Sequence, residues 1–167
     1  ERVAINMAAD VADVNGGATT GDYFDMSAYE RCLVLLVMGD GTAGQDIDLA
    51  MYQATDNAGT GAKVLNALET GRIFTKYAAD FTAYQALTAW TQVTQATADE
   101  AYAPTDNGES VGLIALEIRA ADLDATNSFS HIRCDLTDPG AAKIVTLLYI
   151  GMDPVDSTSP TLMDSGT

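Results

Sequence analysis

A run of seven consecutive apolar residues, Cys32 to Met38, constrains the fold of this chain more than any other segment. The run is rich in branched side chains and is far shorter than the roughly 20 residues of a membrane-spanning helix. It therefore predicts a strand that is covered on both faces, or a central strand of a sandwich. Four segments are the predicted central strands: Arg31–Met38, Ile47–Gln53, Val111–Ile118 and Ile144–Ile150.

Glycine and aspartate separate these strand-like segments. Asp outnumbers Glu by 18 to 6 and there are 14 Gly, a composition that favours turns over a helical bundle. The sequence predicts an all-β fold, an antiparallel β-sandwich of seven or eight strands, with a jelly roll as one option. The glycine-rich segment 39–44 is expected to close a hairpin between the first two central strands. At most one short helix is expected, in 78–90, where Phe81, Tyr84 and Leu87 recur at helical spacing after Asp80, a suitable N-cap.

The length of 167 residues suits one domain, expected over residues 1–150. Residues 1 to about 14 alternate only weakly and are predicted to form an N-terminal arm. Residues 151–167, with two Pro among Ser, Thr and Asp, are predicted to form an extended C-terminal tail. We expect both ends to be mobile in the isolated protein.

The charge of the chain excludes several classes of partner. With 24 acidic and 8 basic residues the formal net charge is −16, and no segment gathers the basic residues into a patch. Such a surface repels phosphate, so binding to nucleic acid or to an anionic membrane is not expected. No basic region followed by an apolar stretch opens the chain, so no secretory signal is visible in it.

The sequence contains little that could support catalysis. His131 is the only histidine, lies within a strand-like segment, and is accompanied by no GxSxG motif. Cys32 and Cys134 lie in apolar surroundings, which favours buried free thiols, with a disulfide between them as the alternative. These three residues lack the spacing of a zinc site. We predict a protein without enzymatic activity, catalytic residues or cofactor.

Acidic residues cluster at two places. Asp40, Asp46 and Asp48 surround the glycine-rich loop, and Asp122 and Asp124 flank Leu123. Calcium prefers oxygen ligands of this kind, but neither cluster has the spacing of a calcium-binding loop. Paired carboxylates also serve glycosidases, yet a single Trp gives no sign of a sugar-binding cleft. Solvated turn carboxylates are the favoured interpretation, no metal site is predicted, and a calcium-dependent extracellular binding module is an alternative.

Several segments resemble a family of small virion proteins of tailed phages. The family's Asn-Gly turn is similar to Asn15-Gly16-Gly17. Its "Val-Asp-Leu-x-x-Tyr-Glu" segment is similar to Tyr23-Phe24-Asp25-Met26-Ser27-Ala28-Tyr29-Glu30, and the strand that follows is similar to the apolar run. The strand Ile47 to Gln53, followed by Thr55-Asp56-Asn57, resembles the next strand and its Asp-rich turn. Ile118 to Arg133 resembles the block "Leu-Asp-x-x-x-Gly-Phe-x-x-Val-Arg". The sequence Leu148-Tyr149-Ile150-Gly151-Met152-Asp153-Pro154 resembles the closing "Leu-Tyr-x-x-x-Asp-Pro-Arg-Tyr", except that Val155-Asp156 replaces Arg-Tyr.

The resemblance covers about half of the chain and is poor over residues 66–110. It implies a capsid decoration (cement) protein on the outer face of the phage head, which binds the major capsid protein and stabilises the shell. It also implies self-association, first as a homotrimer at three-fold positions and second as a dimer across two-fold positions, with a monomer as the third option. The alternative within the virion is a neck, tail or head-fibre component. The acidity suits the outer surface of a capsid, away from packaged DNA.

Residues 66–110 hold many of the aromatic side chains and are expected to contribute to the interface with the capsid or with other subunits. The candidate interface residues are Phe81, Tyr84, Trp90 and Tyr102. Of these, Tyr84, Trp90 and Tyr102 are expected to be exposed apolar loop residues.

Overall fold

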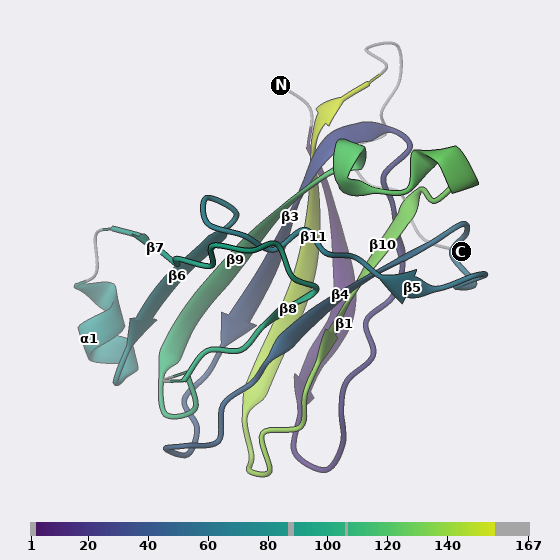
Figure 1. The fold of residues 1–167 in the computed structure, drawn as a ribbon. Coiled ribbons are helices and arrows are strands. Elements are labelled where there is room, and N and C mark those ends of the chain that lie inside the picture. The colour runs from purple at the N-terminus through teal and green to yellow at the C-terminus, as the bar shows by residue number, and fades with distance from the viewer. Residues whose placement is uncertain (1–2, 87–88, 106, 156–167) are drawn as a thin grey trace.

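Two antiparallel sheets face each other in the computed structural model, which describes residues 3–86, 89–105 and 107–155 (Figure 1). The larger, sheet A, contains in spatial order β1 (Ala4–Asp13), β11 (Ile144–Pro154), β3 (Tyr29–Met38), β9 (Val111–Arg119), β6 (Ile73–Ala78) and β7 (Thr91–Gln92). Sheet B contains β2 (Phe24–Asp25), β10 (His131–Leu136), β4 (Leu49–Ala54) and β5 (Lys63–Val64), with β8 (Ala101–Tyr102) also paired to β4. The predicted all-β antiparallel sandwich is confirmed, and each predicted central strand lies within β3, β4, β9 or β11, save the first residues of the second.

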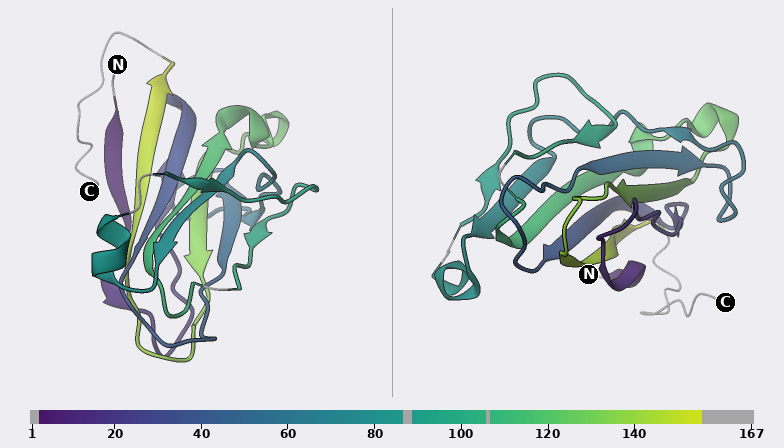
Figure 2. Two further views of the ribbon diagram at one scale, coloured as in Figure 1. Left: turned by 90° about the vertical axis from the view of Figure 1, so that its left-hand side faces the viewer. Right: turned by 90° about the horizontal axis from the view of Figure 1, so that it is seen from below.

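Helical structure is limited to short segments among the described residues. α1 (Phe81–Gln85) lies at the predicted place, and the Asp80 side chain caps it by accepting a hydrogen bond from the backbone N–H of Ala83 at 2.7 Å. Two 3-10 turns, η1 (Ala120–Asp122) and η2 (Ala125–Asn127), connect β9 to β10. The views of Figure 2 show α1 at one edge of the sandwich, beside β6.

The core lies between the sheets and follows the alternation of the strands. Cys32, Val34 and Leu36 of β3 face it, and Ile132 and Cys134 of β10 face it from sheet B. A hydrogen bond also joins the two layers, because the backbone N–H of Cys134 donates to the buried Tyr149 hydroxyl at 2.7 Å. Both cysteines are buried free thiols, as predicted.

A buried lysine holds the connection that precedes β9. The ammonium of Lys143 donates hydrogen bonds to the backbone carbonyls of Asn107, Gly108 and Ser110. The buried Asn107 amide in turn bonds both the N–H and the carbonyl of Ile47, each at 2.9 Å. The loops at this end of the sandwich are therefore fixed by polar contacts within the protein.

These contacts explain why the predicted hairpin is wrong. β3 and β4 belong to different sheets, so the segment between them crosses from one layer to the other. A Cβ atom on Gly41 would lie 2.4 Å from the carbonyl oxygen of Gly108, so only glycine permits this close approach. The Asp46 carboxylate accepts the Gly108 N–H at 2.7 Å, which ties the crossing segment to the 107–110 loop rather than to β3.

The N-terminal residues form a strand and not the predicted arm. β1 pairs with β11 along its length, with register irregularities between Met7 and Ala12, and places Ala4 and Ala8 in the core. Alanine at the inward positions gave too weak an apolar pattern to reveal this strand. At the other end β11 continues through Pro154, beyond the predicted domain boundary at residue 150. The rest of the predicted tail, residues 156–167, lies outside the described residues.

Candidate functional site

The outward face of sheet A is apolar although it lies away from the core. On β3 the inward side chains are buried, while Leu33 and Leu35 are half-buried and Val37 is exposed on the opposite side. A sheet that packs on one side only normally alternates apolar residues with polar ones. β3 therefore has apolar side chains on both faces, which is the composition of a strand that is covered on both faces. In this chain only one of its faces packs against the core.

The register of the strands aligns these outward side chains into rows. One row crosses five strands and joins Met7, Leu148, Leu35, Ala115 and Phe74. Parallel rows lie on both sides of it. We call the set of outward side chains of β1, β11, β3, β9 and β6 the outer face. Its apolar members include Ile5, Met7, Leu33, Leu35, Val37, Phe74, Leu113, Ala115, Ile144, Leu148, Ile150 and Met152.

Two places on the outer face project most strongly into solvent. Ile5 and Met7, on the edge strand β1, are 56% and 51% exposed. At the end formed by α1, Phe81 is 66% exposed, and Ile144 is also exposed. Isolated apolar side chains are common on protein surfaces. A contiguous apolar surface, in contrast, is typical of a protein–protein interface.

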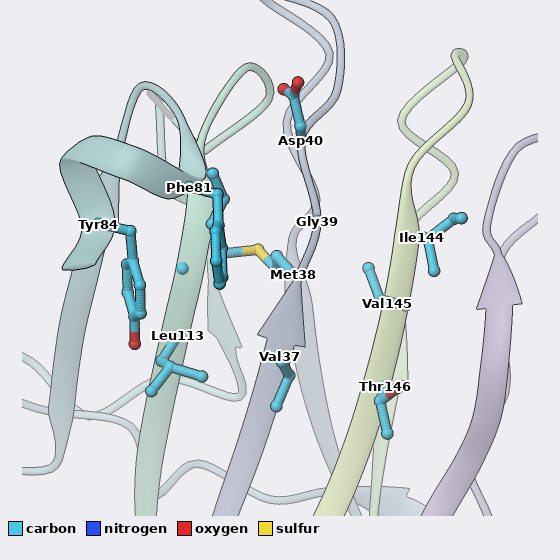
Figure 3. A pocket seen from close by; sticks show the side chains of 12 residues that line it. Val37, Met38, Gly39, Asp40, Phe81, Tyr84, Leu113, Ile144, Val145 and Thr146 are labelled. Carbon is cyan, nitrogen blue, oxygen red and sulfur yellow. The ribbon is translucent and has the colours of Figure 1, made fainter.

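A hollow of about 450 Å³ lies at the α1 end of the outer face (Figure 3). Phe81 and Tyr84 border it from the helix, and Val37 and Leu113 border it from β3 and β9. The Asp80 cap fixes α1 beside this hollow. The Lys76 ammonium lies 5.3 Å from the centre of the Tyr84 ring and so helps to hold that ring in place. The hollow is large enough to receive one or two apolar side chains of a partner.

Charged side chains are confined to the margins of the outer face. At the end opposite the hollow, Arg31 pairs with Asp153 at 2.6 Å and lies 3.7 Å from Glu117, which also pairs with Arg119 at 3.0 Å. The remaining charges on its described strand positions are Lys76 and Asp13, which pairs with Ile144, and Asp40 borders the hollow. The described strand positions of this face thus carry three basic and three acidic side chains, whereas the chain as a whole carries three acidic residues for each basic one.

Three of the four predicted interface residues lie at the surface of sheet A or beside it, and the fourth is buried in the core. Phe81 and Tyr84 border the hollow, and Trp90, 44% exposed, precedes the edge strand β7 of the same sheet. Tyr102 is only 8% exposed and packs in the core, with its hydroxyl 3.3 Å from that of Tyr77. Tyr102 was expected to be exposed because it borders a polar loop, but its pairing in β8 turns the ring inward.

Sequence reasoning missed the strand residues that form most of the face. Leu33, Leu35, Leu113 and Leu148 were assigned to strands but not to an interface. The available signal was that both alternating sets of residues are apolar in β3 and in the first part of β11.

Three of the five carboxylates in the two acidic clusters, Asp46, Asp122 and Asp124, make hydrogen bonds within the protein. Asp122 forms a two-pronged ion pair with Arg72, and Asp124 bonds Lys63, which lowers the pKa of the Asp124 carboxyl. The pKa of Asp48 is raised by partial burial and by the neighbouring Asp46. No group of three or more His, Cys, Asp or Glu that could hold a metal is found in the described part of the chain.

The side chains that could act as nucleophiles or bases are two buried cysteines and one histidine that contacts its sequence neighbour. Burial raises the pKa of the Cys32 thiol to about 12 and raises that of Cys134 as well. The His131 ring nitrogen Nδ1 lies 2.9 Å from the hydroxyl of its sequence neighbour Ser130.

No helix in the described ranges has the length and apolarity needed to cross a membrane.

Comparison with known proteins gives no family. No protein-family model matches the chain, and no curated protein matches its sequence. Among solved structures, the SPBc2 prophage-derived protein YomS overlaps with 89% of this chain and 91% of its own, at 10% identity and a TM-score of 0.44. A structure of the infectious bursal disease virus Gt strain overlaps with 92% of this chain and 40% of its own, at 15% identity and a TM-score of 0.27. Overlaps this loose do not assign the chain to a family or a function.

Proposed function

We propose that this protein is a non-enzymatic structural component of a tailed-phage virion, a decoration protein that binds the major capsid protein on the outer face of the head and stabilises the shell. The observation that carries the proposal is the apolar, acid-poor outer face on a chain whose net charge is −16. Such a molecule has one surface suited to protein contacts, with the capsid or with another subunit, and another suited to solvent.

The segments that resemble phage virion proteins support this proposal by their location. They fall on β3, β4, the β9–β10 connection and β11, which form the frame of the sandwich and much of the outer face. Residues 66–110, which resemble the family least, contribute β6, α1, β7 and β8, including the helix beside the hollow.

The surroundings of the nucleophilic groups support a role without catalysis. Both thiols have pKa values raised by burial, which disfavours the reactive thiolate. The hydroxyl that contacts His131 belongs to its sequence neighbour, and no carboxylate among the described residues is hydrogen-bonded to that ring. An orienting third group of the kind that activates a Ser–His pair is therefore not seen in the described structure.

The proposal is tested on phage heads that lack this chain. Purified protein is added, and the bound copies and the temperature of genome release are measured. We expect binding over the whole shell and a higher release temperature. Failure to bind heads, or binding without any change in the release temperature, would contradict the stabilising role.

A variant locates the contact. Trp90→Ala should lower the number of bound copies while leaving the circular dichroism spectrum unchanged. Val64→Ala is the matched control, because Val64 is also an apolar side chain exposed to 44% but lies on sheet B. Equal occupancy by the Trp90 variant and the wild type would remove Trp90 from the proposed interface.

A further inference from the structure

We propose that a second copy of this chain covers the outer face, so that two sheets A pack face to face about a two-fold axis. This inference concerns the free protein and does not depend on the proposed role in the virion. It replaces the expected three-fold assembly with a two-fold one.

The size of the outer face suits a stable dimer. Its five strands, about 4.8 Å apart and six to eleven residues long, cover roughly 24 Å by 28 Å, or nearly 700 Å². A standard protein–protein interface buries about 800 Å² on each partner. One copy of the face is thus large enough to form most of such an interface without further loops.

The composition of the outer face favours a second sheet of the same kind. Leu33 and Leu35 on β3 alternate with core residues of the same chemistry, so both sides of the strand are suited to sheet-on-sheet packing. Face-to-face packing places two sheets about 10 Å apart with interdigitated side chains. The protruding pair Ile5 and Met7 near one edge, and the hollow at the α1 end, give the face projections and a recess that can complement those of a second copy.

The charge distribution permits two strongly acidic chains to meet at this face. Two copies with a charge of −16 each would repel one another across an acidic surface. On the described strand positions of the outer face, however, the basic side chains Arg31, Arg119 and Lys76 are equal in number to the acidic ones, Asp13, Glu117 and Asp153. An isologous contact brings the same patch of both subunits together, and here that patch does not carry the net charge of the chain.

The test is the mass of the purified full-length protein in solution, measured by sedimentation equilibrium from 1 to 100 µM. We expect a dimer, and we expect Leu35→Lys to raise its dissociation constant at least 100-fold because it places a charge at the centre of the face. Met7→Lys, on the exposed edge strand, is a second variant that tests the same face if the Leu35 variant fails to fold. Ala50→Lys is the control with the same added charge, since Ala50 lies on the outward side of sheet B.

Each other outcome overturns the proposal. A wild-type monomer at 100 µM would show that a different molecule covers the face, and capsid binding that Leu35→Lys abolishes would identify the capsid as that molecule. A trimer would exclude the two-fold arrangement. A dimer that neither lysine variant weakens would place the subunit contact elsewhere on the molecule.

Discussion

Lys143 is the side chain on which one end of the sandwich depends. It is buried, and its ammonium donates to three backbone carbonyls of the 107–110 loop. Burial lowers the pKa of Lys143, while nearby carboxylates act in the opposite direction. The carbonyl bonds offset the cost of burying the charge, and without the ammonium these buried carbonyls would lose a charged hydrogen-bond donor.

Lys143→Met should therefore lower the free energy of unfolding by about 2 to 4 kcal/mol. The measurement is urea denaturation followed by tryptophan fluorescence. Lys76→Met, at a partly exposed lysine on the outer face, should cost less than about 1 kcal/mol. A loss no larger than that of the Lys76 control would show that the loop carbonyls do not need the ammonium.

Asp124 gives a prediction for the dependence of stability on pH. Hydrogen bonds from Lys63 and Asn127 lower the pKa of this carboxyl below its ordinary value of 3.8. The stabilisation by its charge is therefore complete above about pH 4 and is lost as the pH falls through the folded-state pKa. Asp124→Asn should lower the urea midpoint at pH 7, and the difference from wild type should shrink towards pH 3. A difference that stays constant from pH 7 to pH 3 would contradict this assignment.

At the scale of elements, β3 directs alternate apolar side chains to the core and to the outer face. Leu36 faces the core and is fully buried, whereas its neighbour Leu35 is half-buried on the outer face. Leu36→Ala should cost about 3 kcal/mol of stability, because it leaves a cavity between the sheets. Leu35→Ala should cost less than about half as much in chemical denaturation at concentrations where the protein is monomeric. Equal losses at such concentrations would mean that the outer face is already covered by the chain's own residues.

The strands were predictable where branched apolar residues are concentrated, and not where the core uses small ones. β3, β9 and β11 were recognised from such residues, and the Asp80 cap marked α1 correctly. β1 was missed because Ala4 and Ala8 fill its inward positions. Gly41 and its neighbours predict a hairpin turn, whereas the chain crosses between the sheets there, because the contacts with Gly108 and Asn107 that direct the crossing are remote in sequence.

The candidate site was predictable only in part, for a related reason. The exposed aromatic residues of 66–110 drew attention to Phe81, Tyr84 and Trp90, which lie on or beside sheet A. The outer face itself depends on the register of five strands that are distant in sequence. The pattern within a single strand does not predict that Met7, Leu35 and Phe74 lie in one row.

At the scale of the whole molecule, charge and hydrophobicity are segregated. Sheet A presents an apolar outer face, and sheet B presents a polar one. On sheet B the Arg133 guanidinium lies 5.0 Å from the centre of the Tyr23 ring and 4.9 Å from that of Tyr52, and it pairs with Asp135 at 2.8 Å. A dimer through sheet A would leave both copies of sheet B, and the acidic loops, available to other partners and to solvent. Linked copies bind a repetitive shell with higher avidity than single ones, even when each contact is weak.

The copy number of this chain relative to the major capsid protein in purified particles tests the central claim most directly. A decoration protein that covers the head should be present in hundreds of copies, in a simple ratio to the major capsid protein. Quantitative mass spectrometry of intact virions measures this ratio. A few to tens of copies, confined to the tail vertex, would contradict the account and would favour a neck, tail or head-fibre component instead.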